Sequence, residues 1–321
     1  MLHARNQTIW PLQPDEILSR SELDEPPKPL KKRELAAAVL KELPRGFRAH
    51  ETKHYVICYN TSKGYAEWAG SLFERLHRAF YNYWSRRGID LEESPPLIAC
   101  VFRDQKSYRA YGSQELGEAV NRILGYYSFS TNRIATYDLL EGRRYRSASQ
   151  INQLLRAERT VATVIHEATH QIAFNSGMHE RFADIPLWLS EGLAIYFESP
   201  DLSSKKGWKT IGKVNSVRLG QFRKFAPQRG SDSLLTLTGD SDRFQSAGLA
   251  TDAYAESWAF CYFLIRTYPD EFAEYLKLLQ QKSPLEEDTS QERWDDFTAA
   301  FGKPPQAMNE EMVKHLRRLG R

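Results

Sequence analysis

The sequence predicts an α+β fold in which a small mixed sheet with its helices is followed by a mainly helical half. Two observations lead to this prediction. Segments rich in β-branched and aromatic residues lie between positions 54 and 138, and segments with apolar residues at helical spacing separate them. After position 140, the strongly patterned segments have the helical period. The chain has 321 residues, 41% of them hydrophobic, which is enough for a large core.

The first 47 residues contain six prolines and alternating blocks of charge. A segment so often interrupted by proline is not expected to fold as a core, so it predicts an extended arm with one short helix around residues 34–42. A plain linker is the simpler alternative. The acidic block includes Glu22, Asp24 and Glu25.

The next segment, residues 48–140, is predicted to form an α/β half. Residues 54–60 are rich in β-formers, and residues 96–102 form a continuous apolar run typical of a central strand. Residues 65–87 have helical periodicity ending at Gly88, and a short helix is expected at residues 105–111. Residues 124–130 and 133–138 predict a hairpin closed at Thr131-Asn132.

Charge and hydropathy exclude several classes of function. The formal net charge is +3, which argues for neither a nucleic-acid partner nor a membrane surface. No run of 18 apolar residues occurs, so no membrane span is expected. The N-terminus lacks the apolar region of a signal peptide and predicts a cytoplasmic protein, although a secreted or periplasmic chain trimmed of its signal would look the same. Three cysteines in apolar segments, Cys58, Cys100 and Cys261, are typical of buried thiols.

The most informative stretch is His166-Glu167-Ala-Thr-His170, within a predicted helix over residues 150–175. Two histidines four positions apart project from one face of a helix and can share a metal ion. Glu167 lies one step around the helix, where its carboxylate can take a proton from water. Most neighbouring residues are apolar, so the helix is expected to be buried, and buried polar groups need partners.

A catalytic zinc ion needs a third protein ligand and one open position. A third histidine in the spacing HExxHxxGxxH is excluded, because Ala173 and Ser176 occupy the required positions. His179 is too distant and is expected to be a surface loop residue after Gly177.

Carboxylates remain as candidates for the third ligand. Asp184 precedes Ile185-Pro186, where it has the pattern of a helix N-terminal cap. Glu191 lies 21 positions after His170, on a second helix beginning near Pro186, and this arrangement brings it back across the histidine face. Glu191 is therefore the preferred third ligand, with Glu198 and Asp184 as alternatives.

The motif HEATH followed by WLSEGLAIYFE resembles the gluzincin metallopeptidases, the thermolysin-like group in which a glutamate on the following helix completes HExxH. Residues 54–275 also resemble an uncharacterised bacterial HExxH family with similar Gly-Tyr-Tyr and Trp-Leu-x-Glu-Gly-Leu-Ala motifs. The resemblance implies a zincin-like catalytic domain that binds Zn²⁺, with residues 141–321 carrying the metal site. In thermolysin-like enzymes an aspartate four positions after the glutamate orients a ligand histidine; here Ile195 stands there, and Glu198 is the candidate for that role.

The same resemblance suggests where substrate lies. One strand of the hairpin would form the upper edge of the cleft and pair with an extended peptide. Tyr126 and Tyr127 would line pockets there, or they are ordinary half-buried tyrosines of the sheet. Tyr254, near the start of an apolar helix over residues 253–265, would bind an oxyanion, or it is structural.

The intervening segment, residues 199–250, is weakly patterned and rich in serine, lysine and glycine. Its cations most simply form a solvated face, with substrate binding as the alternative. They are Lys205, Lys206, Lys209, Arg218, Arg223, Lys224 and Arg229.

These patterns together predict a zinc-dependent peptidase that acts on a peptide or protein substrate. In this hypothesis His166, His170 and Glu191 bind the metal, and Glu167 is the general base for a water at the metal. An inactive zincin-fold module that binds peptides or proteins is the first alternative. A di-iron carboxylate oxidoreductase is the second, because Glu74-Arg-Leu-His77 repeats the Glu-x-x-His pattern of four-helix bundles.

Overall fold

The computed structural model describes residues 1–12, 14–19, 28–141, 143, 145, 147–155, 160–199 and 208–319. The acidic block around Glu22 and the cations Lys205 and Lys206 lie outside the described residues. Contacts divide the chain into two compact units, Met1–His77 with Ser94–Ile172, and Arg78–Glu93 with Ala173–Arg321. The predicted α+β class is confirmed, with a small mixed sheet in the first unit and a mainly helical second unit.

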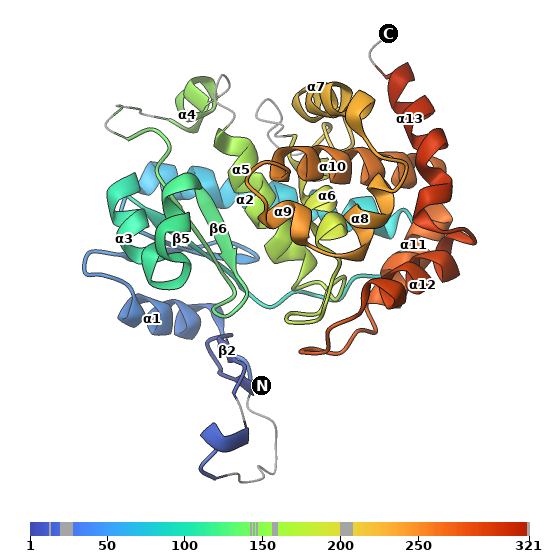
Figure 1. Ribbon diagram of the computed structural model, residues 1–321. Coiled ribbons are helices and arrows are strands. Elements are labelled where there is room, and N and C mark those ends of the chain that lie inside the picture. The colour runs from blue at the N-terminus through green and yellow to red at the C-terminus, as the bar shows by residue number, and fades with distance from the viewer. Residues whose placement is uncertain are drawn as a thin grey trace. The chain divides into compact units, whose positions relative to one another are not determined.

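The first unit is built around a five-stranded sheet of order β3-β4-β5-β7-β6. Its strands β5 and β6 are labelled in Figure 1. The strands are β3 (Arg48–Glu51), β4 (Tyr55–Tyr59), β5 (Leu97–Phe102), β6 (Gly125–Ser128) and β7 (Arg133–Tyr137). Strands β4, β5 and β7 are parallel, and the two outer pairs are antiparallel. Strand β5 is central and buried along its whole length, as its apolar run predicts. Strand β6 is an edge.

Helices cover both faces of this sheet. The helices of this unit are α1 (Lys32–Glu42), the first part of α2 (Lys63–Ser85), α3 (Gln105–Leu116), α4 (Ala148–Leu155) and α5 (Thr160–Ala173). One face packs against α1 and α3 in a core that includes Leu35, Cys100 and Tyr108. On the other face Tyr55 stacks on Phe73 of α2, with ring centroids 5.2 Å apart. The 3-10 helices are Pro14–Glu16 and Gly117–Arg122.

Part of the segment predicted to be an arm belongs to the folded core. Leu35 and Val39 of α1 are fully buried against the sheet, because this helix presents an apolar stripe despite the prolines around it. The short strands β1 (Leu2–His3) and β2 (Ile9–Trp10) form a hairpin that the sequence did not predict. Ile9 is buried, and its backbone N–H donates to the carbonyl of Ser130 at 2.8 Å.

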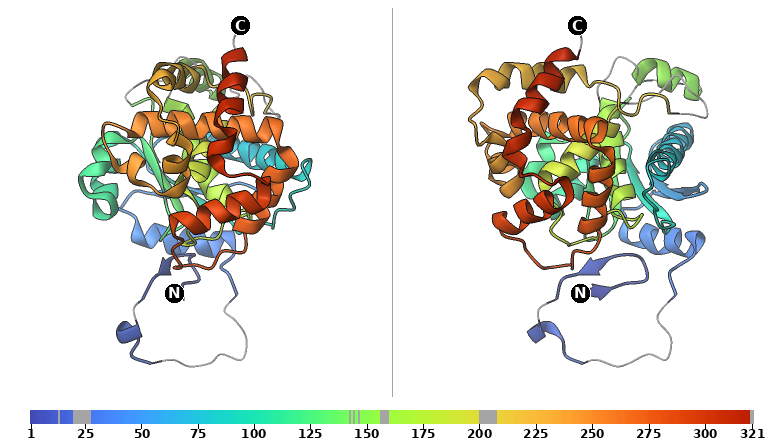
Figure 2. Two further views of the ribbon diagram at one scale, coloured as in Figure 1. Left: turned by 45° about the vertical axis from the view of Figure 1, so that its right-hand side comes forward. Right: turned by 90° about the vertical axis from the view of Figure 1, so that its right-hand side faces the viewer.

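The second unit is helical. Its α-helices are the last part of α2, then α6 (Leu187–Phe197), α7 (Ser216–Phe225), α8 (Ser233–Gly239), α9 (Asp242–Gln245), α10 (Ala250–Thr267), α11 (Pro269–Leu279), α12 (Ser290–Phe301) and α13 (Asn309–Arg318). The 3-10 helices are Ala226–Gln228 and Pro305–Met308. Helix α10 is the buried centre of this unit, and α13 runs across it (Figure 2).

Helices α6 and α10 approach closely at Gly192. A Cβ atom at this position would lie 2.6 Å from the carbonyl oxygen of Ser257 and would also overlap the sulfur of Cys261. The approach requires glycine, and it fixes the helix that carries Glu191 against the centre of the unit.

A buried ion cluster holds the segment between α7 and α10. The Glu256 carboxylate is fully buried and accepts hydrogen bonds from Arg229 Nε at 2.7 Å, Arg243 at 2.7 Å and the Ser233 hydroxyl at 2.9 Å. The prediction that Arg229 lies on a solvated face is therefore wrong, because its guanidinium is needed to neutralise a buried carboxylate.

The cysteines are as predicted: Cys58, Cys100 and Cys261 are free and buried. Burial raises the pKa of the Cys100 thiol to about 11 and also raises the pKa of the other two thiols. Among the helices of the described residues, none combines the length and apolar character needed to cross a membrane.

Candidate metal centre

Helix α5 presents its two histidines to each other. The Nε2 atoms of His166 and His170 are 3.1 Å apart, and the ring planes meet at 79° with centroids separated by 4.7 Å. His170 is buried and His166 is half-buried. This convergence follows from the four-residue spacing on a helix, which places successive side chains one turn apart on the same face.

Gln171, which directly follows His170 on α5, anchors this helix to the sheet. The side-chain amide of Gln171, which is fully buried, donates to the carbonyls of Ile98 and Asn132, both at 2.9 Å. These carbonyls belong to β5 and to the residue just before β7, so one side chain sets the position of the histidine helix along the sheet.

Glu191 of α6 completes a group of three ligands. One ligand atom from each of His166, His170 and Glu191 lies within 4.8 Å of the others, and Glu191 is half-buried. Over the described ranges of the chain, no other group of three His, Cys, Asp or Glu side chains meets this condition. That Glu191 is the third ligand stays a prediction.

The two histidines are spaced as two ligands of one zinc ion would be. With Zn–N distances of about 2.0–2.1 Å, an Nε2–Nε2 separation of 3.1 Å corresponds to an N–Zn–N angle of roughly 100°, near tetrahedral. Two facing Nε2 atoms cannot both carry a proton, so the pair requires either a shared proton or a cation between them. Two imidazoles and one carboxylate are a common ligand set for catalytic zinc, and this set leaves the fourth position open.

Glu167 is held beside the edge of the sheet. The backbone N–H of Tyr127 in β6 donates to its carboxylate at 2.9 Å. Among the strands that the structure describes, β6 pairs with β7 alone, so this N–H lies on the open side of the strand. The candidate base therefore adjoins the edge strand, and a main-chain group orients it.

The side chains of Tyr126 and Tyr127 have structural contacts. Tyr126 belongs to the hydrophobic core beneath the sheet, and burial raises the pKa of its phenol. The Tyr127 hydroxyl donates to the side-chain carbonyl of Asn132 at 2.7 Å. These contacts favour ordinary sheet tyrosines over pocket-lining residues, one of the two interpretations that the sequence left open.

Tyr254 is the fifth residue of α10 and is half-buried. Its ring is 5.3 Å from that of Phe244 in an edge-on contact, and the guanidinium of Arg218 lies 5.6 Å from its centroid. Its role in binding an oxyanion stays a prediction.

Asp184, one of the two competing ligands for the metal, is bound elsewhere. Both carboxylate oxygens of Asp184 accept from Arg293, at 2.9 and 2.6 Å, and one also accepts from the backbone N–H of Asp288. The expected cap is wrong, since Pro186 occupies the N-cap of α6 and Asp184 is turned to Arg293 instead. Glu198 is the C-cap residue of α6, and its proposed contact with a histidine stays a prediction.

His179 differs from its prediction as a surface residue. Only 2% of its surface is exposed, and its ring lies 5.2 Å from that of Phe174. The backbone N–H of His179 donates to Ala173, which folds the chain back onto the end of α5. His179 is therefore buried in the turn after Gly177, and the local sequence gives no sign of this burial.

The di-iron alternative does not fit the fold, since a five-stranded sheet is incompatible with a four-helix bundle. Glu74 instead pairs with His54 at 2.7 Å and accepts from the Thr52 hydroxyl at 2.6 Å. The His77 ring stacks on that of His54 with centroids 4.0 Å apart.

Two contributors to the site were not predicted. The Tyr127 N–H that orients Glu167 could not be identified, because nothing in the sequence states which side of the hairpin faces the helix. Gln171 could have been found, because a glutamine among the apolar residues of a helix that is expected to be buried needs hydrogen-bond partners. Its side chain is fully buried.

Comparison with known proteins finds a match to one family, whose function is unknown, over part of the chain. Residues 160–286 match the model of a family described as a protein of unknown function (DUF1570). A search of curated proteins found no match. The matched stretch begins with α5 and includes α6, so it contains the three candidate ligands and Glu167.

Proposed function

We propose that the protein is a zinc-dependent peptidase. One observation carries the proposal: ligand atoms of His166, His170 and Glu191 lie within 4.8 Å of one another, and Glu167 follows His166 directly in the chain. This combination supplies a metal-binding group with an acid–base residue next to it.

The residues of the chain divide the work of hydrolysis. A bound zinc ion would act as a Lewis acid, which lowers the pKa of a water and polarises a substrate carbonyl. Glu167 accepts one proton from the attacking water as the new C–O bond forms, and it donates that proton to the amine nitrogen as the C–N bond breaks. The Tyr127 N–H holds the Glu167 carboxylate in place during both transfers.

The edge strand supports a polypeptide substrate. Strand β6 is outermost in its sheet, and an extended chain can add to such an edge through main-chain hydrogen bonds. Because the Tyr127 N–H already serves Glu167, we expect pairing to use the neighbouring outward-facing groups of the strand.

A second function is favoured by the same hydrogen bond. Because Glu167 accepts a main-chain hydrogen bond, it also has a structural role, and a non-catalytic protein would have reason to keep it. A zincin-like module that binds peptides or proteins without cleaving them would carry the same residues.

The deciding experiment measures cleavage of a mixed peptide library by the zinc-loaded full chain, with mass spectrometry of the products. We expect new termini that disappear with a chelator and return with added Zn²⁺. Zinc-loaded protein that retains library peptides without cleaving them would replace the peptidase with the binding module.

A further inference from the structure

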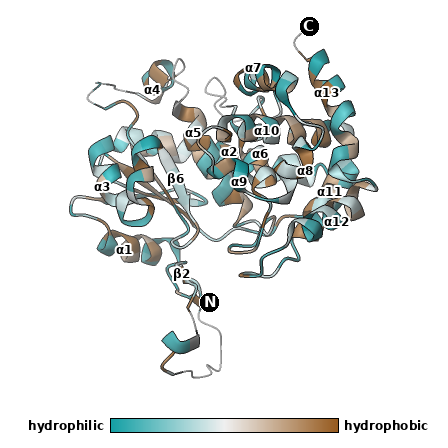
Figure 3. Cartoon of the chain, viewed as in Figure 1, coloured by the Kyte–Doolittle hydropathy of each residue, from teal (hydrophilic) through white to brown (hydrophobic). Residues whose placement is uncertain are grey.

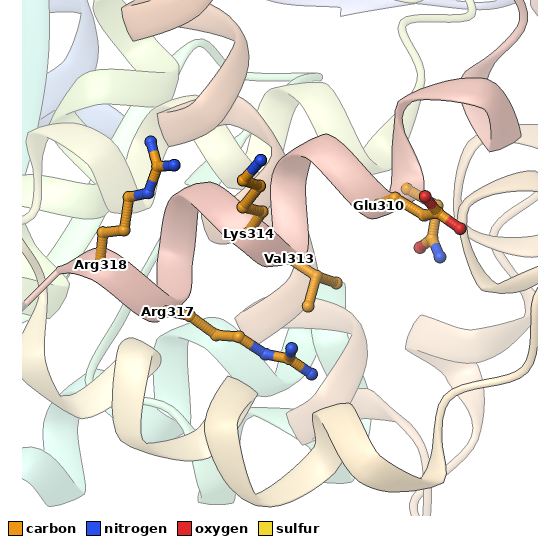
Figure 4. Close-up of a pocket in the computed structure, with 6 residues that line it drawn as sticks. Glu310, Val313, Lys314, Arg317 and Arg318 are labelled. Atoms are coloured by element: carbon orange, nitrogen blue, oxygen red, sulfur yellow. The ribbon is translucent and has the colours of Figure 1, made fainter.

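A second candidate site lies on the C-terminal helix of the helical unit. A groove of about 540 Å³ is lined by Asn309, Glu310, Val313, Lys314, Arg317 and Arg318 of α13 (Figure 4). An adjoining hollow of about 210 Å³ is lined by α13 together with α7 and the 3-10 helix after it. Val313 and Arg317 line both, so the two hollows form one continuous surface, which we call the α13 groove.

The α13 groove is strongly cationic. Lys314, Arg317, Arg318 and Arg223 line it, and among the described lining residues Glu310 alone is acidic. In the part of the chain that the structure describes, Lys314, Arg317 and Arg318 form no ion pair. Attraction to the C-terminal helix dipole accounts for the stability of these cations, but it leaves their charge available to a partner.

The floor of the groove is apolar and fixed. Phe222 and Leu316 are buried, and Ala226, Pro227 and Val313 complete the hollow between the two helices. The guanidinium of Arg223 donates to the carbonyl of Leu319, which ties the end of α7 to the end of α13. The hollow is therefore held open by packing and by a hydrogen bond, as a pre-formed binding site requires.

We propose that the α13 groove binds an acidic polypeptide segment, with an apolar side chain in the hollow and flanking carboxylates on Lys314, Arg317 and Arg318. The cationic side chains attract the carboxylates of the segment, and the apolar floor favours an apolar side chain between those carboxylates. This inference goes beyond the proposed peptidase and does not depend on the metal.

Two other anionic partners fit less well. A membrane surface favours a helix with large exposed apolar residues. Most residues of α13 are hydrophilic (Figure 3), and none of its large hydrophobic side chains is exposed. Single-stranded nucleic acid favours exposed aromatic rings for stacking, whereas Phe222, the aromatic residue among the described lining residues, is 2% exposed.

The test measures fluorescence anisotropy of a labelled peptide of repeated Glu-Glu-Leu with the full chain in chelator, so its outcome is independent of peptidase activity. We expect saturable binding that weakens as ionic strength rises. The double variant Lys314→Glu/Arg317→Glu should bind about tenfold more weakly, because two attractive pairs become repulsive. The double variant Lys41→Glu/Arg45→Glu removes two exposed cations near α1 and should bind as the unmodified chain does.

Additional variants and ligands show which results would overturn the proposal. If charge reversal unfolds the protein, Lys314→Gln/Arg317→Gln serves instead and should weaken binding severalfold. The proposal is overturned if a Gln-Gln-Leu peptide binds equally well, or if the α13 variants bind as the control does. It is also overturned if anionic phospholipid vesicles or single-stranded DNA bind through these residues while the acidic peptide does not.

Discussion

The backbone N–H of Tyr127 lies 2.9 Å from a carboxylate oxygen of Glu167 and donates a hydrogen bond to it. The bond joins the edge of the sheet to the helix that carries His166 and His170. It makes the orientation of Glu167 a property of the main chain, which side-chain substitutions elsewhere do not readily change.

This bond shapes the first prediction, for Glu167→Gln. The amide oxygen of glutamine can accept the same N–H, so the fold and the metal site should be kept. Glutamine cannot take a proton from water, so peptide cleavage should fall about 10²- to 10⁴-fold. The measurement is the initial rate on a cleaved library peptide, with zinc content determined in parallel. The exposed Glu118→Gln is the control, and full activity in Glu167→Gln would show that another group is the base.

The close approach of α6 and α10 gives the second prediction. Gly192→Ala places a methyl group 2.6 Å from a main-chain oxygen that cannot rotate away. We expect a loss of about 1–3 kcal/mol in the free energy of unfolding, measured by urea denaturation. Because Glu191 is adjacent, zinc occupancy should fall as well.

Gly220→Ala on α7 is the matched control, because nothing lies within 4 Å of a Cβ atom there. The same substitution at this site should raise the free energy of unfolding by up to about 1 kcal/mol, since alanine favours the helix. Equal effects at the two glycines would contradict the packing argument.

The third prediction concerns pH and His77. Burial, and then the charge of His54, lower the pKa of His77 from its ordinary value of 6.5 to about 4. As pH falls below 6.5 the unfolded chain takes up a proton at this residue, while the folded protein does so only near pH 4. The contribution of His77 to the free energy of unfolding is therefore fully present above pH 6.5, the pKa of histidine in the unfolded chain. It is lost progressively as the pH falls from 6.5 to about 4.

The variant His77→Gln removes this proton uptake and can still bond to the Ser94 hydroxyl, which lies 3.1 Å from His77 Nε2. Between about pH 7 and pH 5 it should lose roughly 2 kcal/mol less stability than the unmodified chain. Urea denaturation at both values measures the difference. Parallel losses in the two proteins would mean that His77 titrates normally in the fold.

Strong periodic patterns predicted most of the fold. The apolar run of β5, the amphipathic α2 and the buried α10 were all found in place. Short or weakly patterned elements were missed, because their stability comes from distant partners. The segment after α7 shows this, since Arg229 is buried only because Glu256, 27 positions later, accepts its hydrogen bonds.

The candidate site was predictable to the same extent. Helical geometry alone brings His166 and His170 together. Glu191 was chosen by spacing and by a family resemblance, because no local pattern states which carboxylate of a later helix lies near the pair. The Tyr127 contact depends on sheet register and helix placement, which no local pattern encodes.

The central claim is that His166, His170 and Glu191 hold one divalent metal ion. The most direct measurement is the zinc content per chain of the purified protein, for the unmodified sequence, Glu191→Ala and the exposed Glu118→Ala. We predict about one zinc ion per chain for the first and third proteins, and a large loss for Glu191→Ala with unchanged circular dichroism. A folded protein that takes up no zinc, or a Glu191→Ala variant that binds it as fully as the unmodified chain, would contradict the account.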